Sequence, residues 1–502
     1  MIRGSDTLGC FQIESPGQRE LLQKLQPNRW EDLIVDISLF RPGPVKSDMI
    51  TPYLRRRAAL ERPVYIHPDV RPALRETFGV IVYHEQVMRT LAAIAGWDLT
   101  YADHVRRHLD HEELLPGFRE DFLRRAAGRG VDRDAAEKTW DAVAQFASFG
   151  FCKAHAAAFA VPTYRSAWLK AHYPAHFLAG ILTHDPGMYP RRALLDDARR
   201  HGIPILPLDV NRSEPEYTAE ETPAGEYGIR LALQDVHGIS DAEVRSVLMA
   251  RAERSFTDVE DFLRRTTVAR PVVESLAHAG AFDAIPQPTN RRGHLFEAIT
   301  TEAGREGDQL RLSLDAPLAS TTDHPSTGVA GFVFRDYTDA EVVRAELEVL
   351  GLDATRHIAS FYGPLFRDLG VTYAEDVWRR RANEWVMVAG VKVSSQTPAI
   401  RSGQRIIFLT LDDGTGPLEV TIFESVQPKV AKTVFHSFAM AVWGQVRRTG
   451  LKGVSVVAED VWDLTMLHRA RADGSLREAM AGPVQPQSPD RRLWHASPGS
   501  AG

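Results

Sequence analysis

The sequence is poor in cysteine, since Cys10 and Cys152 are the only two among 502 residues. Two thiols exclude a framework of several disulfides and fit a reducing compartment. No run of 18 apolar residues is present, and the N-terminus lacks the apolar region of a signal peptide. We therefore expect a cytoplasmic protein without a membrane span.

The chain also lacks a strong excess of charge of either sign. Lysine and arginine number 60, aspartate and glutamate number 66, and the formal net charge is -6. Any binding of nucleic acid must therefore come from local patches rather than from the whole chain. A hydrophobic content of 44% is ordinary for a globular protein, and 502 residues suffice for about two to four domains.

One segment lacks acidic residues altogether. No aspartate or glutamate lies between Asp141 and Asp185, although Lys153, His155 and Arg165 lie there. The alanine-rich run predicts a helix whose first turn holds Lys153 and His155 beside unpaired backbone N–H groups. Cations and free N–H groups together suit a phosphate. The alternative is a buried helix whose long basic side chains reach water, and the residues alone favour neither.

The same segment carries a long motif, FASFGFCKAHAAAFAVPTYRSAWLKAHYPAHF. It resembles the fingers segment of the bacterial DNA polymerase III alpha subunit, of the C family of DNA polymerases, which reads roughly FxxYGFNKSHSAAYA and then WLKAHYPxxF. Cys152 and Ala154 stand where that family has Asn and Ser. Further matches are GCFQIES near the N-terminus, LFRPGP at 39–44 and YHEQVM at 83–88.

The resemblance implies a nucleotide site. Arg106 and Arg107 match paired arginines that reach the phosphates of the incoming dNTP in the family, and Lys153 and His155 join them as nucleotide-binding residues. The family has lysines directly after the arginine pair, whereas this chain has HLDHEE. Without the resemblance, two surface arginines on a helix would be the better interpretation.

The resemblance also implies contacts with a DNA primer–template. Arg41 stands before a rigid Pro-Gly-Pro turn, and Arg55 and Arg56 begin a basic run. The family lines its channel for DNA and nucleotide with this region, so these three arginines become DNA-binding candidates. A solvated helix end is the alternative for the basic run.

The chain is predicted to be a multidomain α+β protein. Residues 1–220 form a mostly helical fingers domain with a connector. Residues 228–286 form tandem helix–hairpin–helix units, in which Gly238 and Ser240 would offer a hairpin to a DNA phosphate. Short helical hairpins without a role in DNA binding are the alternative.

The strands of the barrel are predicted in the last third of the sequence. Residues 384–463 alternate in five short strands, which predicts an OB-fold barrel. The barrel has balanced charge, so single-strand binding and protein binding both stay open. Residues 464–502 are predicted to be a disordered tail.

Residues 287–345 are predicted to be a flexible linker with a peptide for a sliding clamp. Its glutamine and spaced leucines resemble the clamp-binding motif, in which leucines fill an apolar pocket and glutamine makes a polar anchor. A small edge strand is the alternative. The candidate residues are Gln309, Leu310, Leu312 and Leu314.

Catalytic and metal-binding residues are not found. The family adds nucleotides with magnesium, held by palm aspartates that include a D-x-D pair. The D-x-D of this chain, Asp132-Arg133-Asp134, is predicted to begin a helix. We expect the chain alone to be inactive. It would be one piece of a split polymerase whose palm lies on a separate chain, a truncated gene product, or a decayed remnant without function. A non-catalytic DNA- and clamp-binding accessory protein is the alternative, and both replicative and error-prone roles fit.

Overall fold

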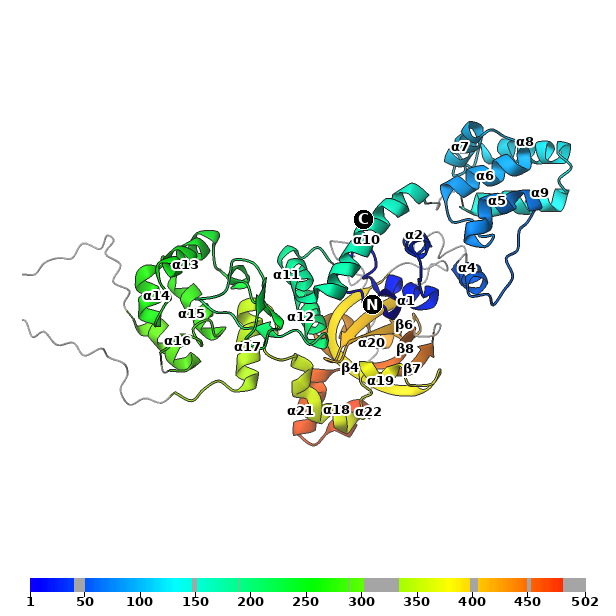
Figure 1. Ribbon diagram of the computed structural model, residues 1–502. Helices are drawn as coiled ribbons and strands as arrows, with labels where there is room; N and C mark the ends of the chain where they lie inside the picture. The colour runs from blue at the N-terminus through cyan, green and yellow to red at the C-terminus, as the bar shows by residue number, and fades with distance from the viewer. Residues whose placement is uncertain are drawn as a thin grey trace, which may run out of the picture. The chain divides into compact units, whose positions relative to one another are not determined.

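The computed structural model describes residues 1–39, 50–146, 151–187, 189–287, 289–301, 334–397, 405–448 and 453–481 (Figure 1). The chain divides into two compact units. The first consists of Met1–His172 and Pro364–Gly502, and the second of Tyr173–Gly363. Within the described ranges, no helix is both long enough and apolar enough to cross a membrane.

The first stretch of the first unit is helical. The hydroxyl of Ser15 accepts the N–H of Gln18 at 3.4 Å, and Pro16 occupies the first helical position, so these two residues define the start of α1. The helices of this stretch are η1 (Ile2–Gly4), α1 (Pro16–Leu25), α2 (Trp30–Leu39), α4 (Ile50–Arg57), η2 (Pro68–Val70), α5 (Arg71–Leu74), η3 (Arg75–Thr77), α6 (His84–Ala95), α7 (Leu99–Arg107), α8 (Leu115–Gly128), α9 (Arg133–Phe146) and α10 (Lys153–His172).

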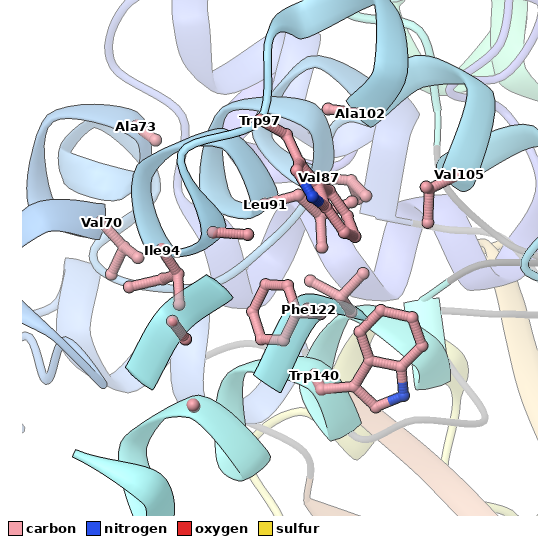
Figure 2. Close-up of a cluster of buried hydrophobic side chains, with 14 of the residues drawn as sticks. Val70, Ala73, Val87, Leu91, Ile94, Trp97, Ala102, Val105, Phe122 and Trp140 are labelled. Atoms are coloured by element: carbon pink, nitrogen blue, oxygen red, sulfur yellow. The ribbon is translucent and has the colours of Figure 1, made fainter. Parts of the chain in front are cut away.

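Helices α6 to α9 share one hydrophobic core, drawn in Figure 2. The ring of Phe122 lies at its centre, with centroids 5.7 Å from Trp97 and 5.4 Å from Trp140. Leu91 and Val105 are completely buried in the same cluster. This core fixes the position of α6, whose first turn forms part of the candidate site.

Helix α10 packs against α2 through small residues. Ala156 and Ala160 are completely buried against a cluster that includes Leu33, Ile34 and Tyr53. Alanine at successive turns of α10 lets the two helices approach closely. The prediction of a buried helix and that of a helix with a cationic first turn are therefore compatible, because the buried alanines and Lys153 lie on the same helix.

The last part of the first unit is a closed barrel. Its strands follow the order β4-β5-β6-β8-β7, and all neighbouring pairs are antiparallel except β6 and β8. A Cβ at Gly444 would lie 2.2 Å from the carbonyl oxygen of Val457, so only glycine fits at this irregularity between β7 and β8. The elements are α18 (Gly363–Leu369), α19 (Ala374–Val377), β4 (Trp385–Gln396), β5 (Ile407–Asp412), β6 (Pro417–Ile422), α20 (Gln427–His436), β7 (Ala439–Arg448), β8 (Val454–Asp463), α21 (Leu464–Ala472) and α22 (Leu476–Ala481). The predicted OB-fold is confirmed.

The second unit combines a small sheet with helices. Strand β3 pairs with β1 in parallel and with β2 in antiparallel orientation. Gly238 precedes α13 with a left-handed φ of 85°, and the predicted fold class, with its helix–hairpin–helix region, is confirmed. The elements are α11 (Pro174–His184), α12 (Arg191–Arg200), β1 (Ile205–Leu206), β2 (Thr218–Glu221), β3 (Tyr227–Arg230), η4 (Leu233–Asp235), α13 (Asp241–Glu253), α14 (Val259–Arg265), α15 (Arg270–His278), α16 (Arg291–Thr300), α17 (Asp339–Leu350) and η5 (Ile358–Tyr362).

Two predicted irregular segments contain helices, so those predictions were wrong in part. Within the supposed linker 287–345, α16 is capped by Asn290 and buries Ala298, and α17 begins with a capping box of Thr338 and Glu341. Within the supposed disordered tail 464–502, Asp463 caps α21, which buries Leu464 and Leu467. Residues 302–333 and 482–502 lie outside the described residues.

The buried histidine of α16 predicts acid sensitivity of the second unit. His294 is 1% exposed, and burial lowers its pKa to about 4 from the ordinary 6.5. Between these values the unfolded chain binds more protons than the folded one, so stability falls as pH falls. We expect a loss of about 2 kcal/mol between pH 7 and 5 from this group.

Urea unfolding of the full chain at both pH values, with hydrogen exchange followed in α15 and α16, measures this effect. His294→Leu should flatten the pH dependence, whereas the exposed His237→Ala should leave it unchanged. If the free energy of unfolding depended on pH equally in His294→Leu and in the natural chain, His294 would not be the source of the acid sensitivity.

Candidate functional site

A cavity of about 760 Å³ lies in the first unit, beside the first turn of α10. Its charged lining contains four cations and two carboxylates, so the cavity has a formal excess of positive charge. The lining residues are Arg29, Pro72, Ala73, Arg75, Glu76, Phe78, Glu85, Gln86, Arg89, Lys153, Ala154 and Ala157. A cavity of this size can enclose a nucleotide-sized ligand.

Two helices begin side by side at this cavity. Tyr83, which precedes α6, forms a parallel β-bridge with Phe151, which precedes α10. The N–H of His84 donates to the carbonyl of Phe151 at 3.0 Å. The bridge therefore places the positive ends of two helix dipoles next to each other.

One internal carboxylate already serves this positive region. The N–H of Lys153 donates to Oε1 and to Oε2 of Glu85, at 3.1 Å each, and the thiol of Cys152 lies 3.6 Å from Oε1. Glu85 also belongs to the first turn of α6. The first turn of α10 thus contacts an anion, and in this structure that anion is the side chain of Glu85.

The ammonium group of Lys153 faces the cavity from the same turn. Its Nζ donates to Oε2 of Glu76 at 2.5 Å and lies 5.4 Å from the centroid of the Tyr83 ring. The side chain of Lys153 is 38% exposed, so water and ligands can reach it. An exposed ion pair of this kind is weak and can be replaced by a more highly charged partner.

Three further cations of the cavity were not predicted from the sequence. Arg29 contacts Asp32 at 3.3 Å. Arg75 and Arg89 are exposed, and neither has an ion pair within the part of the chain that the structure describes. These arginines lie far from Lys153 in the sequence and follow no motif, so only the fold brings them to the cavity.

The other predicted nucleotide-binding residues lie elsewhere. Arg106 and Arg107 end α7 and both contact Asp103 at 2.8 Å, and neither lines the cavity. Partial burial would raise the pKa of Asp103, but hydrogen bonds from both arginines outweigh it and lower this pKa. His155 is exposed on α10, with its ring centroid 4.1 Å from that of Phe159.

The predicted DNA-binding arginines have partners within the protein. Arg55 and Arg56 contact Glu61 at 3.4 and 3.2 Å, and Arg56 also donates to the carbonyl of Phe78 at 3.2 Å. Arg55 keeps more than half of its side chain exposed, at 57%, whereas Arg56 keeps 15%. Arg41 lies outside the described residues.

The hairpin candidates Gly238 and Ser240 lie directly before α13. A Cβ built at Gly238 would have no heavy atom within 4 Å, so its backbone is accessible to a ligand. The hydroxyl of Ser240 accepts the N–H of Glu243 at 3.3 Å in a capping box. Gln309, Leu310, Leu312 and Leu314 lie outside the described residues.

Two pairs of acidic residues accept hydrogen bonds from nearby backbone N–H groups. Oδ2 of Asp132 accepts the N–H groups of Asp134 and Ala135 at 3.0 and 3.3 Å, which confirms the predicted helix cap. Asp412 and Asp413 accept N–H groups of their own turn, from Gly414 and Thr415.

Comparisons with known proteins agree with this architecture. Residues 1–130 match the family model of the bacterial DNA polymerase III alpha subunit finger domain, residues 202–293 match a helix-hairpin-helix motif, and residues 386–464 match an OB-fold nucleic acid binding domain.

Among curated relatives, the chain is 36% identical over 490 residues to an error-prone DNA polymerase of Symbiobacterium thermophilum, covering 90% of this chain and 45% of the relative. It is 34% identical over 455 residues to an error-prone DNA polymerase of Alkalilimnicola ehrlichii, covering 90% of this chain and 42% of the relative. The chain thus spans less than half the length of these relatives.

The contact between Glu85 and α10 predicts a defined loss of stability. Glu85→Ala removes the carboxylate that accepts the first N–H of α10, and we expect the free energy of unfolding to fall by about 1 kcal/mol. Urea unfolding of the full chain measures the change. Glu112→Ala, an exposed residue after α7, is the matched control and should change stability by less than about 0.5 kcal/mol. Equal stabilities of the two variants would contradict a capping role of Glu85.

Proposed function

We propose that this chain, which belongs to the family of the bacterial DNA polymerase III alpha subunit, supplies the nucleotide- and DNA-binding part of a DNA polymerase for repair synthesis. The finger, helix-hairpin-helix and OB-fold matches support a polymerase part, and the names of the relatives support an error-prone one. The observation that carries the proposal is the cationic cavity at the paired starts of α6 and α10.

The cavity binds the triphosphate of the incoming dNTP in this proposal. Phosphate oxygens replace the carboxylates of Glu76 and Glu85 at Lys153 and at the first N–H of α10. Arg75 and Arg89 have no ion pair to break among the described residues, and their planar guanidinium groups can each hold a phosphate by two hydrogen bonds.

The remaining predicted residues have secondary roles. Arg106 and Arg107 reach a phosphate only by leaving Asp103, so we place them at the edge of the nucleotide site. Arg41, Arg55 and Arg56 contact the primer–template, and the hairpin at Gly238 contacts a duplex phosphate through its backbone. The segment from Gln309 to Leu314 binds the sliding clamp, a proposal that rests on its sequence.

Catalysis requires more than the residues of this chain. We propose that the palm aspartates and their magnesium ions belong to another polypeptide segment, which meets the finger domain in the complete polymerase. The alternative, an accessory protein that binds DNA and the clamp without catalysis, uses the same surfaces. A neighbouring reading frame that encodes a palm favours the polymerase.

The nucleotide proposal predicts a loss of affinity on removal of single cations. Lys153→Ala and Arg89→Ala should each weaken dNTP binding about tenfold, because each removes a charge-assisted hydrogen bond. Fluorescence anisotropy with a labelled dNTP and the full chain measures this. Lys138→Ala, which removes an exposed lysine paired with Asp134 on α9, is the matched control. Unchanged affinity in both cavity variants would contradict the proposal.

A second prediction concerns catalysis. The purified chain, given a primed template, dNTPs and magnesium, should extend no primer by itself. Addition of a separately produced palm segment should restore extension, and Lys153→Ala should reduce the restored rate. Extension by the chain alone would show that the catalytic acids lie within it.

A further inference from the structure

Three histidines follow one another where α7 ends. His104 and His108 are four residues apart, and His111 lies in the turn that follows the helix. Residues four apart on a helix lie on the same face, one turn from each other. The ring centroids of His104 and His108 are 4.4 Å apart, and those of His108 and His111 are 5.4 Å apart. Two histidines at this helical spacing are an arrangement that binds zinc.

The hydrophobic core fixes the backbone that carries these histidines. Val105 and Leu109, which directly follow the first two of them, are buried in the core of α6 to α9, and Val105 is labelled in Figure 2. His104 itself is exposed, and the ring centroids of Tyr101 and Phe118 each lie 6.0 Å from that of His104. Rotation of exposed side chains on a fixed backbone can bring two imidazoles to one ion, so binding orders few groups.

A hydrogen bond sets the tautomer of the middle histidine. Nδ1 of His108 lies 2.7 Å from the carbonyl oxygen of His104. Because a carbonyl oxygen can only accept, Nδ1 carries the proton of the neutral ring and Nε2 keeps its lone pair. Histidines that bind a metal through one ring nitrogen usually donate the other to a carbonyl or a carboxylate, which fixes the tautomer. His108 therefore already has the tautomer that binds a metal through Nε2.

The charges around the three histidines favour a cation. The two arginines between the first two histidines are both paired with Asp103, at 2.8 Å each. Asp110, Glu112 and Glu113 are exposed on the following turn. Carboxylate oxygens of Asp110 and Glu113 lie 3.8 and 3.6 Å from the ring nitrogens of His111. The C-terminal end of α7 adds the negative end of a helix dipole. A positive ion is therefore attracted to the place where the imidazoles are.

We propose that the end of α7 is a binding site for a divalent transition-metal ion such as Zn²⁺, with His104 and His108 as the chelating pair and His111 as a third ligand. Imidazole nitrogen suits Zn²⁺, Ni²⁺ and Cu²⁺, whereas Mg²⁺ and Ca²⁺ prefer oxygen ligands. The ion ties α7 to the turn that leads into α8 and so stabilises the core of α6 to α9. This inference goes beyond the proposed function and does not depend on it, because other residues line the nucleotide cavity.

Protection of single histidines from diethyl pyrocarbonate, read by mass spectrometry of the full natural chain, tests the proposal directly. Saturating ZnCl2 should slow the modification of His104 and His108 by about tenfold, because a metal-bound nitrogen cannot react, and EDTA should restore it. His436, an exposed histidine in the last turn of α20, is the internal control and should react equally with and without zinc. Unchanged modification of His104 and His108, or protection of His111 alone, would overturn the proposal.

Calorimetric titration of the full chain with ZnCl2 gives an independent measurement. His104→Ala/His108→Ala should lose one equivalent of bound zinc relative to the natural chain, whereas the matched control His436→Ala should keep it. The same zinc stoichiometry in both variants would refute the proposal. Replacing ZnCl2 by MgCl2 should give no protection of the two histidines, because magnesium prefers oxygen ligands. Equal protection by magnesium would assign the binding to the neighbouring carboxylates instead of the imidazoles. The protection experiment uses the natural chain, so it stays decisive if the alanine variant fails to fold.

Discussion

The parallel bridge between Tyr83 and Phe151 is the constraint on which the candidate site depends. It joins segments 68 residues apart and starts two helices side by side. Two positive helix ends at one place are unfavourable unless an anion lies between them. Glu85 supplies that anion within the fold, and the cations of the cavity surround it. The fold therefore holds one anion, the carboxylate of Glu85, at the paired helix starts.

Carboxylates of the protein itself partly neutralise the positive charge of the cavity. Glu76 and Glu85 neutralise Lys153 and the first turn of α10, whereas Arg75 and Arg89 have no ion pair among the described residues. In the proposed binding mode, a phosphate would exchange these weak internal contacts for stronger ones instead of creating a new site.

Much of the fold could be predicted from the sequence, because local signals determine it. Ser15 and Pro16 begin α1, the alanine run forms α10, and strand alternation gives the barrel. The helices α16, α17, α21 and α22 were not predicted, because they are short and lie in or beside polar segments with proline, glycine and serine. Of these, α16, α17 and α21 begin with a side-chain cap.

The site could be predicted only in part. Lys153 was found because it belongs to a motif and begins a helix. Arg75 and Arg89 could not be found, since their proximity to Lys153 is a product of tertiary packing. The ion pairs of Arg106 and Arg107 with Asp103 could have been predicted from the sequence. Asp103 lies three and four residues before these arginines, which is the spacing at which ion pairs form on a helix.

The central claim is that the phosphate-binding part of this chain is the cavity between the starts of α6 and α10. Photolabelling of the full chain with an azido-dATP, followed by identification of the labelled peptides, tests it most directly. The account predicts labels on peptides that contain Arg75 to Arg89 or the first turns of α10, and their loss when unlabelled dATP is added. Labels confined to the peptide of Arg106 and Arg107, or labels that unlabelled dATP does not displace, would contradict it.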